Sequence, residues 1–552
     1  MIKKYSKLIL LLIIVAASIL RLYKLTTYPA LNADEAAIGY NAYSLLETGK
    51  DEHGNPWPIH FQSFNDYKPG LYFYMVLPFV KFLGLNELAV RLPATLLGIA
   101  SIYVIYLLVK ELFSKERLAL IAALFLAISP WHIHFSRGGW EVNVATFLIL
   151  LGVYLFIRAT STKLRKFYIF SAIAFVASLY AYHAARVIVP LFGLGIKLIY
   201  SKKVKQHAKD ILVAAVIGAL LLAPLVVDLT QGSVLSRAAG VGLFADHGPI
   251  NRINEQRGQH ESFLSFPARI YHNKAVNYGL AFLQNWAEHY SVEFLFLSGD
   301  DIERNKVPET GQAYLYDILL VLVGLFAIAT VKKGTKEQKG WKLFLWWLLI
   351  APSAAALTFQ SPHALRAQNM AIPLTVMAAF GLETILVWLE NKKTQKILGK
   401  VGVVTLGLLI VWNFARYQHM YWVHMAKEYK FSSQYGVKEL VEFTSSVEDD
   451  YEGVVVTHRY DQPYILYLFY LKYPPAEFQK DHSLTPRDEF GFSTVIHFDD
   501  YYFVEIDNWD RIRESYRNMV IAGTDEEISD LANVVKKIYG TNGHLYFKVV
   551  IN

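Results

Sequence analysis

Long apolar stretches separated by short polar segments dominate this chain. Each stretch is close to the ~20 residues that an α-helix needs to cross a bilayer. The eleven stretches are Leu8–Leu25, Leu92–Val109, Leu118–Phe135, Val142–Ile157, Phe167–Tyr182, Val187–Tyr200, Ile211–Val227, Ala313–Val331, Trp341–Leu357, Ala371–Leu389 and Val401–Phe414. The pattern predicts a polytopic α-helical membrane protein with about 11 transmembrane helices.

Positive charge is concentrated in alternate gaps between these stretches, and the positive-inside rule assigns such loops to the cytoplasm. The clusters are Lys3, Lys4 and Lys7; Lys110, Lys115 and Arg117; Lys163, Arg165 and Lys166; Lys202, Lys203, Lys205 and Lys209; Lys332, Lys333, Lys336 and Lys339; and Lys392, Lys393 and Lys396. Eleven spans with a cytoplasmic N-terminus place every cluster on one side and the C-terminus outside. A twelfth apolar segment, Gly70–Leu85, is short and would break this parity. We interpret it as an interfacial or re-entrant helix of the first outer loop.

Three large regions then lie outside the membrane: residues 26–91, residues 228–312 and the tail that follows Arg416. We expect residues 1–415 to form a transmembrane catalytic domain and residues 416–552 a small extracytoplasmic domain. The tail alternates β-rich and helical segments, which is typical of an α/β domain. The β-rich segments are Gly453–Thr457, Tyr501–Ile506 and Leu545–Ile551, and the helical one is Thr524–Ile538.

Composition supports a membrane protein and excludes several classes of function. Of 552 residues, 54% are hydrophobic and 14% aromatic, which is too apolar for an ordinary soluble domain of this length. The net charge of +7 comes from loop clusters rather than from one basic face, so no nucleic-acid partner is indicated. The absence of cysteine excludes disulfides, thiolate metal sites and a cysteine nucleophile. Met1–Leu20 resembles a secretion signal but lacks a cleavage site, so we interpret it as a retained first span.

Two adjacent carboxylates, Asp34 and Glu35, lie at the predicted start of a helix in the first outer loop. Asn32 and Glu35 have the spacing of a capping box, and Gly49 is a typical C-terminal stop. Two interpretations stay open on spacing alone. The carboxylates either only favour the positive end of the helix dipole, or one of them stays ionised there and accepts a proton from a substrate hydroxyl.

Five basic residues lie at outer ends of spans or in outer loops, where topology does not require them: Lys68, Arg91, Arg137, Arg186 and Arg366. Any single one is explained by snorkelling or by pairing with a lipid phosphate. Five of them from separate loops favour a common anionic ligand, because cations at membrane depth are costly. A lipid-linked phosphate is the anion that arginine binds well in a bidentate manner.

Further candidates lie along the same outer rim. Glu141 begins a span four residues after Arg137, so it either pairs with that arginine or serves as a catalytic carboxylate. The other rim candidates are His132, His134, His183, His363 and Tyr67. No histidine spacing specifies a metal site, so we assign no metal ligand. A requirement for a divalent metal stays open.

Several of these residues occur in motifs that resemble the GT-C membrane glycosyltransferases, in particular the protein O-mannosyltransferase and aminoarabinose transferase group. The motifs are Asn32-Ala33-Asp34-Glu35, Tyr67-Lys68-Pro69-Gly70-Leu71-Tyr72, Asn86-Glu87-Leu88-Ala89-Val90-Arg91-Leu92-Pro93, Ser136-Arg137 with Glu141, and Pro362-His363-Ala364-Leu365-Arg366-Ala367. The resemblance covers the first ~160 residues as a fingerprint of several parts. It thins through the middle spans.

The resemblance implies roles for four of these residues. Asp34 would be the catalytic base and Glu35 an acceptor or hydrogen-bonding partner, while Lys68 and Arg91 would contact the carrier phosphate. The chain departs from the family pattern at two positions, where Gly70 replaces a common second proline and Glu141 replaces a common aspartate. Neither departure removes a charge that the chemistry requires.

The sequence therefore predicts an inverting glycosyltransferase of the plasma membrane that takes a sugar from a polyprenyl-phosphate donor. The acceptor would be a hydroxyl of a protein, lipid or glycan on the outer face. No P-loop and no glycine-rich dinucleotide-binding motif is present. Two alternatives from other classes are a lipid-linked sugar transporter or flippase and a non-catalytic envelope assembly subunit. A transporter is expected to place its charges near the bilayer midplane rather than at the outer rim.

Overall fold

The computed structural model describes residues 2–64, 66–230, 242–391, 396–429, 432, 434–487, 492–529 and 533–552. The chain forms two compact units, which we name the bundle unit and the tail unit. The bundle unit comprises Met1–Arg21, Leu96–Ser136 and Glu141–Gln418, and the tail unit comprises Leu22–Thr95, Arg137–Trp140 and His419–Asn552. The first predicted outer loop thus belongs to the same unit as the tail.

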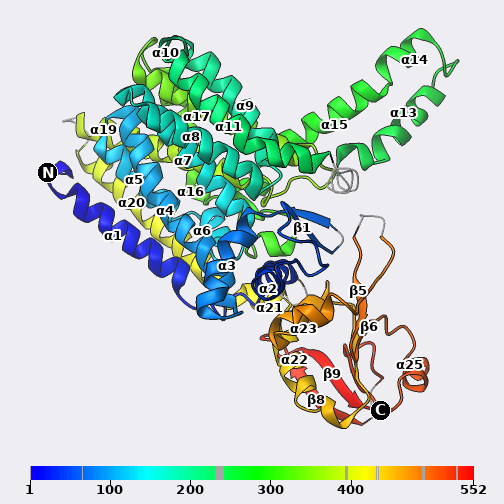
Figure 1. The fold of residues 1–552 in the computed structure, drawn as a ribbon. Coiled ribbons are helices and arrows are strands. Elements are labelled where there is room, and N and C mark those ends of the chain that lie inside the picture. The colour runs from blue at the N-terminus through cyan, green and yellow to red at the C-terminus, as the bar shows by residue number, and fades with distance from the viewer. Residues whose placement is uncertain are drawn as a thin grey trace. The chain divides into compact units, whose positions relative to one another are not determined.

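The bundle unit is built from helices (Figure 1). These are α1 (Ile2–Leu22), α4 (Glu87–Phe113), α5 (Glu116–Ile128), α6 (Pro130–Ser136), α7 (Glu141–Thr162), α8 (Arg165–Ala181), α9 (Ala185–Ile199), α10 (Ser201–Gln206), α11 (Ala208–Leu229), α13 (Gly248–Gly258), α14 (Phe266–Tyr271), α15 (Lys274–Glu288), α16 (Leu315–Ala329), α17 (Lys336–Ile350), α18 (Ser353–Ala356), α19 (Ala371–Asn391) and α20 (Lys396–His419). Helix α8 packs against α7 and α11, and α16 packs against α19. Each predicted apolar stretch coincides with one or two of these helices.

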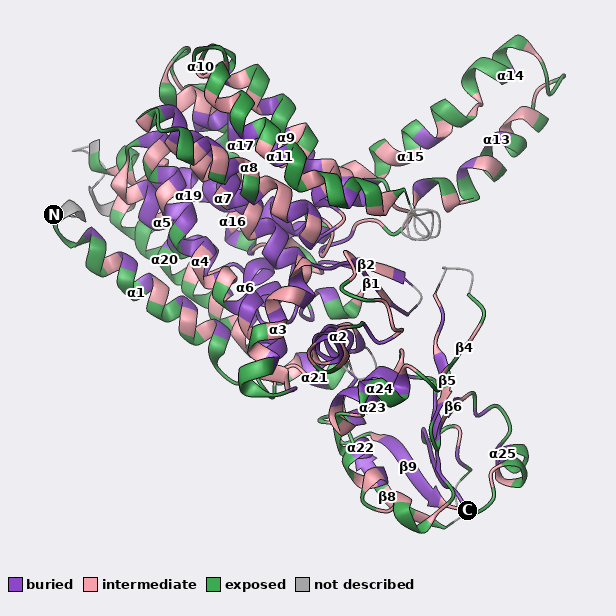
Figure 2. Cartoon of the chain, viewed as in Figure 1, coloured by how far each residue is buried: buried purple, intermediate pink, exposed green. Residues whose placement is uncertain are grey.

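The outward surfaces of the bundle helices are apolar, as lipid contact requires. Leu8 of α1, Leu220 of α11 and Leu408 of α20 are all exposed. Figure 2 shows exposed positions along α1 and α11. Among the described residues, six helices are long and apolar enough to cross a membrane, and the bent pair α5–α6 raises the number to seven. Several of the other predicted spans form shorter helices, so the count of eleven stays a prediction.

The tail unit contains the first outer loop and the C-terminal residues. Its helices are α2 (Ala33–Thr48), α3 (Leu71–Leu83), α21 (Met425–Glu428), α22 (Val437–Ser445), α23 (Pro463–Leu471), α24 (Pro475–Phe478) and α25 (Trp509–Ser515). Its strands are β1 (His60–Ser63), β2 (Asp66–Pro69), β3 (Val454–Thr457), β4 (Ser483–Leu484), β5 (Val495–Phe498), β6 (Tyr501–Val504), β7 (Val520–Gly523), β8 (Val534–Tyr539) and β9 (Leu545–Ile551). Helix α3 coincides with the apolar segment that we interpreted as interfacial or re-entrant, and it is helical as expected.

Strands β3 to β9 form one mixed sheet in the order β4-β5-β6-β3-β7-β9-β8. The central strand β3 runs parallel to β6 and β7, and the outer pairs are antiparallel. Val455, Ile521 and Val550 of three strands pack with Trp509 and Ile512 of α25 in a buried core. The prediction of β structure at 453–457, 501–506 and 545–551 is confirmed, and so is a tail with mixed α and β structure.

The helix predicted over Thr524–Ile538 is wrong. Residues 525–528 form turns, and strand β8 begins at Val534 and pairs antiparallel with β9. Val534, Val535 and Ile538 are β-branched, and their pairing with β9, the next strand along the chain, outweighs the local helical pattern. Residues 530–532 of this prediction lie outside the described residues, as do 392–395 of the last basic cluster and 231–241 of the second outer region.

Candidate active site at the start of α2

Helix α2 begins as the sequence predicts, with a complete capping box. The Asn32 side chain accepts a hydrogen bond from the backbone N–H of Glu35, and the Glu35 carboxylate accepts one from the backbone N–H of Asn32. Gly49 ends the helix with a φ of 70°, a left-handed conformation that glycine adopts without strain. The cap fixes the direction in which the two acidic side chains leave the helix.

Asp34 is the accessible carboxylate of the pair. Its Oδ1 accepts a hydrogen bond of 2.5 Å from Lys68 Nζ, and the Asp34 side chain is 25% exposed while that of Lys68 is 7% exposed. Lys68 lies on the β1–β2 hairpin, opposite Phe61, and its ammonium lies 4.7 Å from the centre of the Phe64 ring. Tyr67 precedes it on the same strand and is partly exposed. The hairpin therefore holds a cation against Asp34 and leaves part of the carboxylate open.

Glu35 is buried and fully engaged by the protein. Arg91 Nε and Nη2 donate to its two carboxylate oxygens at 2.7 Å each, and the backbone N–H of Gly139 donates at 2.7 Å. The other Arg91 donors bond the carbonyl oxygens of Leu25, Pro29 and Ala30. All five N–H groups of the guanidinium are thus used within the tail unit, and the pair joins three segments of the chain.

Arg137 is also surrounded by protein groups of the tail unit. Its Nε donates to the Tyr421 hydroxyl at 2.9 Å, and its Nη2 donates to the carbonyl oxygens of Tyr23 and Tyr28. The guanidinium lies 4.8 Å from the centre of the Trp422 ring, a cation–π contact. Helix α6 ends at Ser136 and α7 begins at residue 141, so the helical spacing that suggested a pair with Glu141 does not exist.

The remaining predicted site residues belong to the bundle unit. Glu141 is the first residue of α7, and Arg186 donates to the carbonyl oxygen of Leu179 and contacts His183 Nδ1 at 3.0 Å. Arg366 donates to the Thr358 hydroxyl at 2.7 Å. The predicted residues are therefore divided between the two units, with Asp34, Glu35, Tyr67, Lys68, Arg91 and Arg137 in the tail unit.

His363 takes part in a polar cluster of the bundle unit that the motif alone did not reveal. Its Nδ1 lies 3.6 Å from the buried carboxylate of Asp300, and its backbone N–H donates to His289 Nε2. His289 Nδ1 is 2.7 Å from the carbonyl oxygen of Asn285, so Nδ1 carries the proton of a neutral ring. Burial lowers the pKa of His289 to about 4 and raises that of Asp300.

Sequence reasoning missed a buried acid–histidine pair in the tail unit. Glu52 is fully buried, and its two carboxylate oxygens have no hydrogen-bond partner among the described residues. His53 Nε2 lies 3.6 Å from Glu52 Oε1, and His53 Nδ1 lies 3.1 Å from His482 Nε2. No local sequence pattern indicates this pair, because His482, which contacts His53, is 429 residues away along the chain.

The hydrogen bonds define where the protons of this pair reside. His482 Nδ1 faces the carbonyl oxygen of Phe478 at 2.7 Å and must donate to it, so Nε2 of a neutral His482 accepts from His53 Nδ1. A neutral His53 then turns the lone pair of Nε2 toward Glu52. Burial, followed by the charge of Asp51, raises the pKa of Glu52 well above its ordinary value, and burial lowers the pKa of His53 to about 3. The folded pair therefore holds one proton, on Glu52.

Metal binding finds no support in these clusters. Among the residues that the structure describes, no group of three or more histidine, aspartate or glutamate side chains could hold a metal ion. The chain also contains no cysteine. Neither the sequence nor the structure assigns a divalent metal to this protein.

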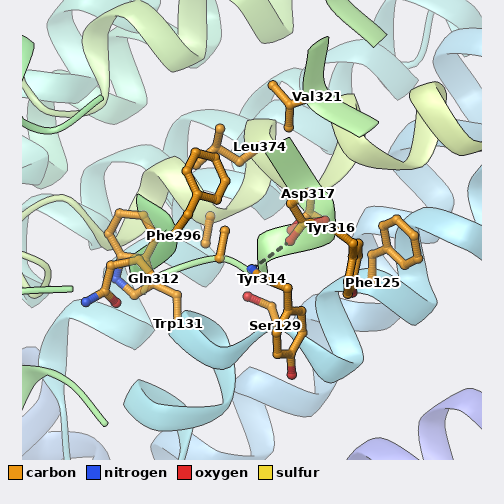
Figure 3. Close-up of a pocket in the computed structure, with 13 residues that line it drawn as sticks. Phe125, Ser129, Trp131, Phe296, Gln312, Tyr314, Tyr316, Asp317, Val321 and Leu374 are labelled. Atoms are coloured by element: carbon orange, nitrogen blue, oxygen red, sulfur yellow. Dashed lines mark hydrogen bonds between the residues drawn. The ribbon is translucent and has the colours of Figure 1, made fainter. Parts of the chain in front are cut away.

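The bundle unit contains two cavities that lack the predicted site residues. One, lined by Trp131, Phe296, Tyr314 and Asp317 among others, has a volume of about 20 Å³ (Figure 3). That volume suits a single water molecule rather than a sugar. The other has a volume of about 360 Å³ and includes Arg416, which is ion-paired with Glu309 at 2.8 Å.

Comparison with known proteins agrees with this architecture. Residues 67–227 match the family model of dolichyl-phosphate-mannose-protein mannosyltransferase. Among solved structures, ArnT from Cupriavidus metallidurans in the apo state has a TM-score of 0.54 and 10% sequence identity, with 99% of this chain and 98% of that chain covered. Its structure bound to undecaprenyl phosphate has a TM-score of 0.53 and the same identity, over 100% and 98%.

The archaeal oligosaccharyltransferase AglB from Archaeoglobus fulgidus, in complex with an inhibitory peptide and a dolichol-phosphate, is also similar. The TM-score is 0.53 at 13% sequence identity, and the alignment covers 85% of this chain and 64% of that chain. This chain thus spans less than two thirds of the archaeal protein. A comparison with curated protein sequences finds no significant match.

These findings support the resemblance that the motifs indicated: residues 67–227 match a mannosyltransferase family model, and the chain shares the fold of solved GT-C glycosyltransferases. The six or seven helices among the described residues that are long and apolar enough to cross a membrane agree with a multi-pass membrane protein. The likeness to the solved structures, at 10–13% identity, concerns the fold.

Proposed function

We propose that the chain transfers a sugar from a polyprenyl-phosphate carrier to an acceptor hydroxyl on the outer face of the membrane. The observation that carries this proposal is the Asp34–Lys68 pair at the start of α2, where a partly open carboxylate lies 2.5 Å from a cation. The matched family and the undecaprenyl-phosphate complex of ArnT support a lipid-phosphate donor. The mannosyl group of the family name favours a hexose as the sugar.

In the proposed mechanism, Asp34 accepts the proton of the acceptor hydroxyl as the oxygen attacks the anomeric carbon. A new C–O bond forms on one face of the sugar while the bond to the carrier phosphate breaks on the other, so the anomeric configuration inverts. The polyprenyl phosphate leaves with the electron pair. Lys68 stabilises the ionised Asp34 and contributes positive charge toward the departing phosphate.

The contacts of Glu35 and Arg91 favour a positioning role rather than contact with substrate. A guanidinium that donates all five N–H groups to protein oxygens has none left for a phosphate. We assign Arg137 to positioning for the same kind of reason. Arg186 and Arg366 remain proposed phosphate contacts, and Glu141, His183, His363 and Tyr67 remain candidates, each to be tested by itself.

The experiment that tests this function supplies the donor in a defined form. Purified protein in nanodiscs is given radiolabelled polyprenyl-phosphate mannose and an envelope extract from a strain that lacks the protein. We expect label to leave the lipid phase and appear on an acceptor without any added nucleotide. If label moves only when a nucleotide sugar is supplied, or does not move at all, the proposed donor is wrong.

A further inference from the structure

A helical arm extends from the side of the bundle unit, formed by α13, α14 and α15 (Figure 1). Helices α13 and α15 pack against each other as a hairpin. The hairpin is closed near its tip by a hydrogen bond of 2.6 Å from Arg257 Nε to the carbonyl oxygen of His272, and Tyr278 donates to the carbonyl oxygen of Asp246. The arm is therefore a folded element with a defined surface, which we define as residues 248–288.

The two sides of this arm differ in polarity. Helix α13 exposes polar side chains, among them an ion pair between Arg252 and Glu255 at 2.7 Å. The returning segment is also largely exposed (Figure 2), and it exposes large apolar side chains. These are Phe263, Leu264, Phe266, Ile270, Tyr271, Val276, Leu280 and Leu283. Such a continuous exposed apolar surface marks a site of interaction with lipid or protein.

Along α15 the exposed apolar residues share one face. Val276, Leu280 and Leu283 are separated by four and three residues, which places them on one stripe of a 3.6-residue helix. Lys274 projects on the opposite side and is also exposed. The helix is thus amphipathic. The side chains of its apolar stripe are exposed, so no other residue that the structure describes covers them.

The root of the arm is attached to the end of α17, a helix that coincides with one of the predicted spans. Trp286 Nε1 donates to the carbonyl oxygen of Leu349 at 2.9 Å, and the Tyr290 hydroxyl donates to that of Leu348 at 2.7 Å. Both carbonyls belong to the C-terminal end of α17, while the basic cluster 332–339 lies at its other end. Tryptophan and tyrosine are the residues that anchor helices at the edge of a bilayer.

We propose that the arm lies in the headgroup region of the outer leaflet, with its α14–α15 face inserted among the lipids. At its root the arm contacts α17 beside Leu349, which is itself an exposed apolar residue, so apolar side chains are exposed on both elements where they meet. The arm contains four basic and three acidic residues, so charge contributes little. The occupant is therefore the apolar edge of a bilayer, and attachment should not depend on anionic lipid.

Because the chain has no cysteine, single cysteines can report the surroundings of the arm without a background. Phe266→Cys and Leu280→Cys are labelled with a nitroxide, as are the control variants Lys274→Cys and Arg252→Cys on the polar sides. Each protein is placed in liposomes of neutral lipid. The collision rates of the label with oxygen, which enters lipid, and with a water-soluble nickel chelate are then measured.

We expect labels at 266 and 280 to show a raised oxygen rate and a lowered nickel rate relative to the two controls. Equal, high nickel rates at all four positions would mean that the arm projects into water and would overturn the proposal. Low rates for both reagents at 266 and 280 would mean protein contact, such as a second copy of the chain, and would also overturn it. A raised oxygen collision rate that appears only in liposomes of anionic lipid would contradict insertion through the apolar face.

Discussion

At the scale of single residues, two adjacent carboxylates at the start of α2 have opposite surroundings. Asp34 is partly exposed and meets one cation, whereas Glu35 is buried and accepts hydrogen bonds from Arg91, Gly139 and Asn32. A general base must reach a substrate proton, and a buried carboxylate with its acceptor sites occupied cannot. The surroundings thus favour Asp34 as the proposed base and Glu35 as a residue that holds segments of the tail unit together.

Replacing Glu35 by Gln should unfold the tail unit more readily. The change leaves the Arg91 guanidinium buried without a counter-charge, which costs about 3–5 kcal/mol. Thermal melting of the purified variant measures the loss, with Glu47→Gln, an exposed position of the same helix, as the matched control. The double variant Glu35→Leu with Arg91→Met should recover much of the stability. A single variant that melts like the wild type would contradict the positioning role.

Replacing Lys68 by Met should affect both donor binding and the pH profile of transfer. Loss of one charge-assisted hydrogen bond should weaken donor binding roughly 10- to 100-fold. The acidic limb of the rate profile should move to higher pH, because a carboxylate without the ammonium at 2.5 Å is protonated more easily. Lys68→Arg should restore part of both. Unchanged donor affinity and an unchanged limb would remove Lys68 from the site.

At the scale of elements, the capped helix α2 was predictable because its signals are local. Asn32, Glu35 and Gly49 stand at fixed offsets from the helix that they delimit. The apolar helices of the bundle were predictable for a similar reason, since their length and hydropathy are properties of one segment. The Glu35–Arg91 pair joins residues 56 positions apart, so it was not within reach of a local pattern. Strand β8 pairs with the next strand, β9, and was missed because the local residues also fit a helical pattern.

The loop between α2 and β1 is joined to the C-terminal part of the tail unit by the contact of His53 with His482. The proton held by Glu52 and His53 makes the stability of this loop depend on pH. With ordinary pKa values of 4.5 and 6.5, the unfolded pair holds no proton above about pH 6.5, one between 4.5 and 6.5, and two below 4.5. Because burial raises the pKa of Glu52 and lowers that of His53, the folded pair holds one proton between these values, and its contribution to stability is greatest there.

Melting temperature should therefore decline on both sides of this window, by at most ~1.4 kcal/mol of stability per pH unit from this pair. In Glu52→Gln, only the lowered pKa of His53 remains, so stability should be lost as pH falls below 6.5 and not above it. In His53→Gln, only the raised pKa of Glu52 remains, so stability should be lost as pH rises above 4.5. Difference profiles that shift the same way in both variants would contradict the shared proton.

At the scale of the whole molecule, the predicted site residues are divided between two compact units, and the division into a domain of residues 1–415 and a domain of residues 416–552 stays a prediction. The first outer loop belongs to the same unit as the C-terminal residues, an association that no sequence pattern predicted. Family motifs nonetheless identified both Asp34 and Lys68 as candidate site residues, although in separate roles and not as a pair, because a resemblance carries information that periodicity does not. The family motifs contain His363 but not its partners Asp300 and His289, which only the structure revealed. The contacts among Glu52, His53 and His482 also came only from the structure.

The placement of the tail after Arg416 on the outer side remains a prediction of the charge rule. Trypsin added to sealed right-side-out membrane vesicles should cleave at exposed basic residues of the tail, such as Arg487. Vesicles of the opposite orientation serve as the control and should protect the tail. Cleavage in the inverted vesicles alone would place the tail in the cytoplasm and remove the outer location of the site.

The central claim, that Asp34 is the base of a lipid-phosphate glycosyltransferase, is tested most directly by single-turnover transfer in the Asp34→Asn variant. The substitution keeps size and hydrogen bonding but removes basicity, so transfer from polyprenyl-phosphate mannose should slow by ~10²–10⁴-fold. Donor affinity, melting temperature and the Glu47→Gln control should stay close to the wild type. Transfer at a near-normal rate in a folded Asp34→Asn protein would contradict the account and leave the base to be sought at Glu141.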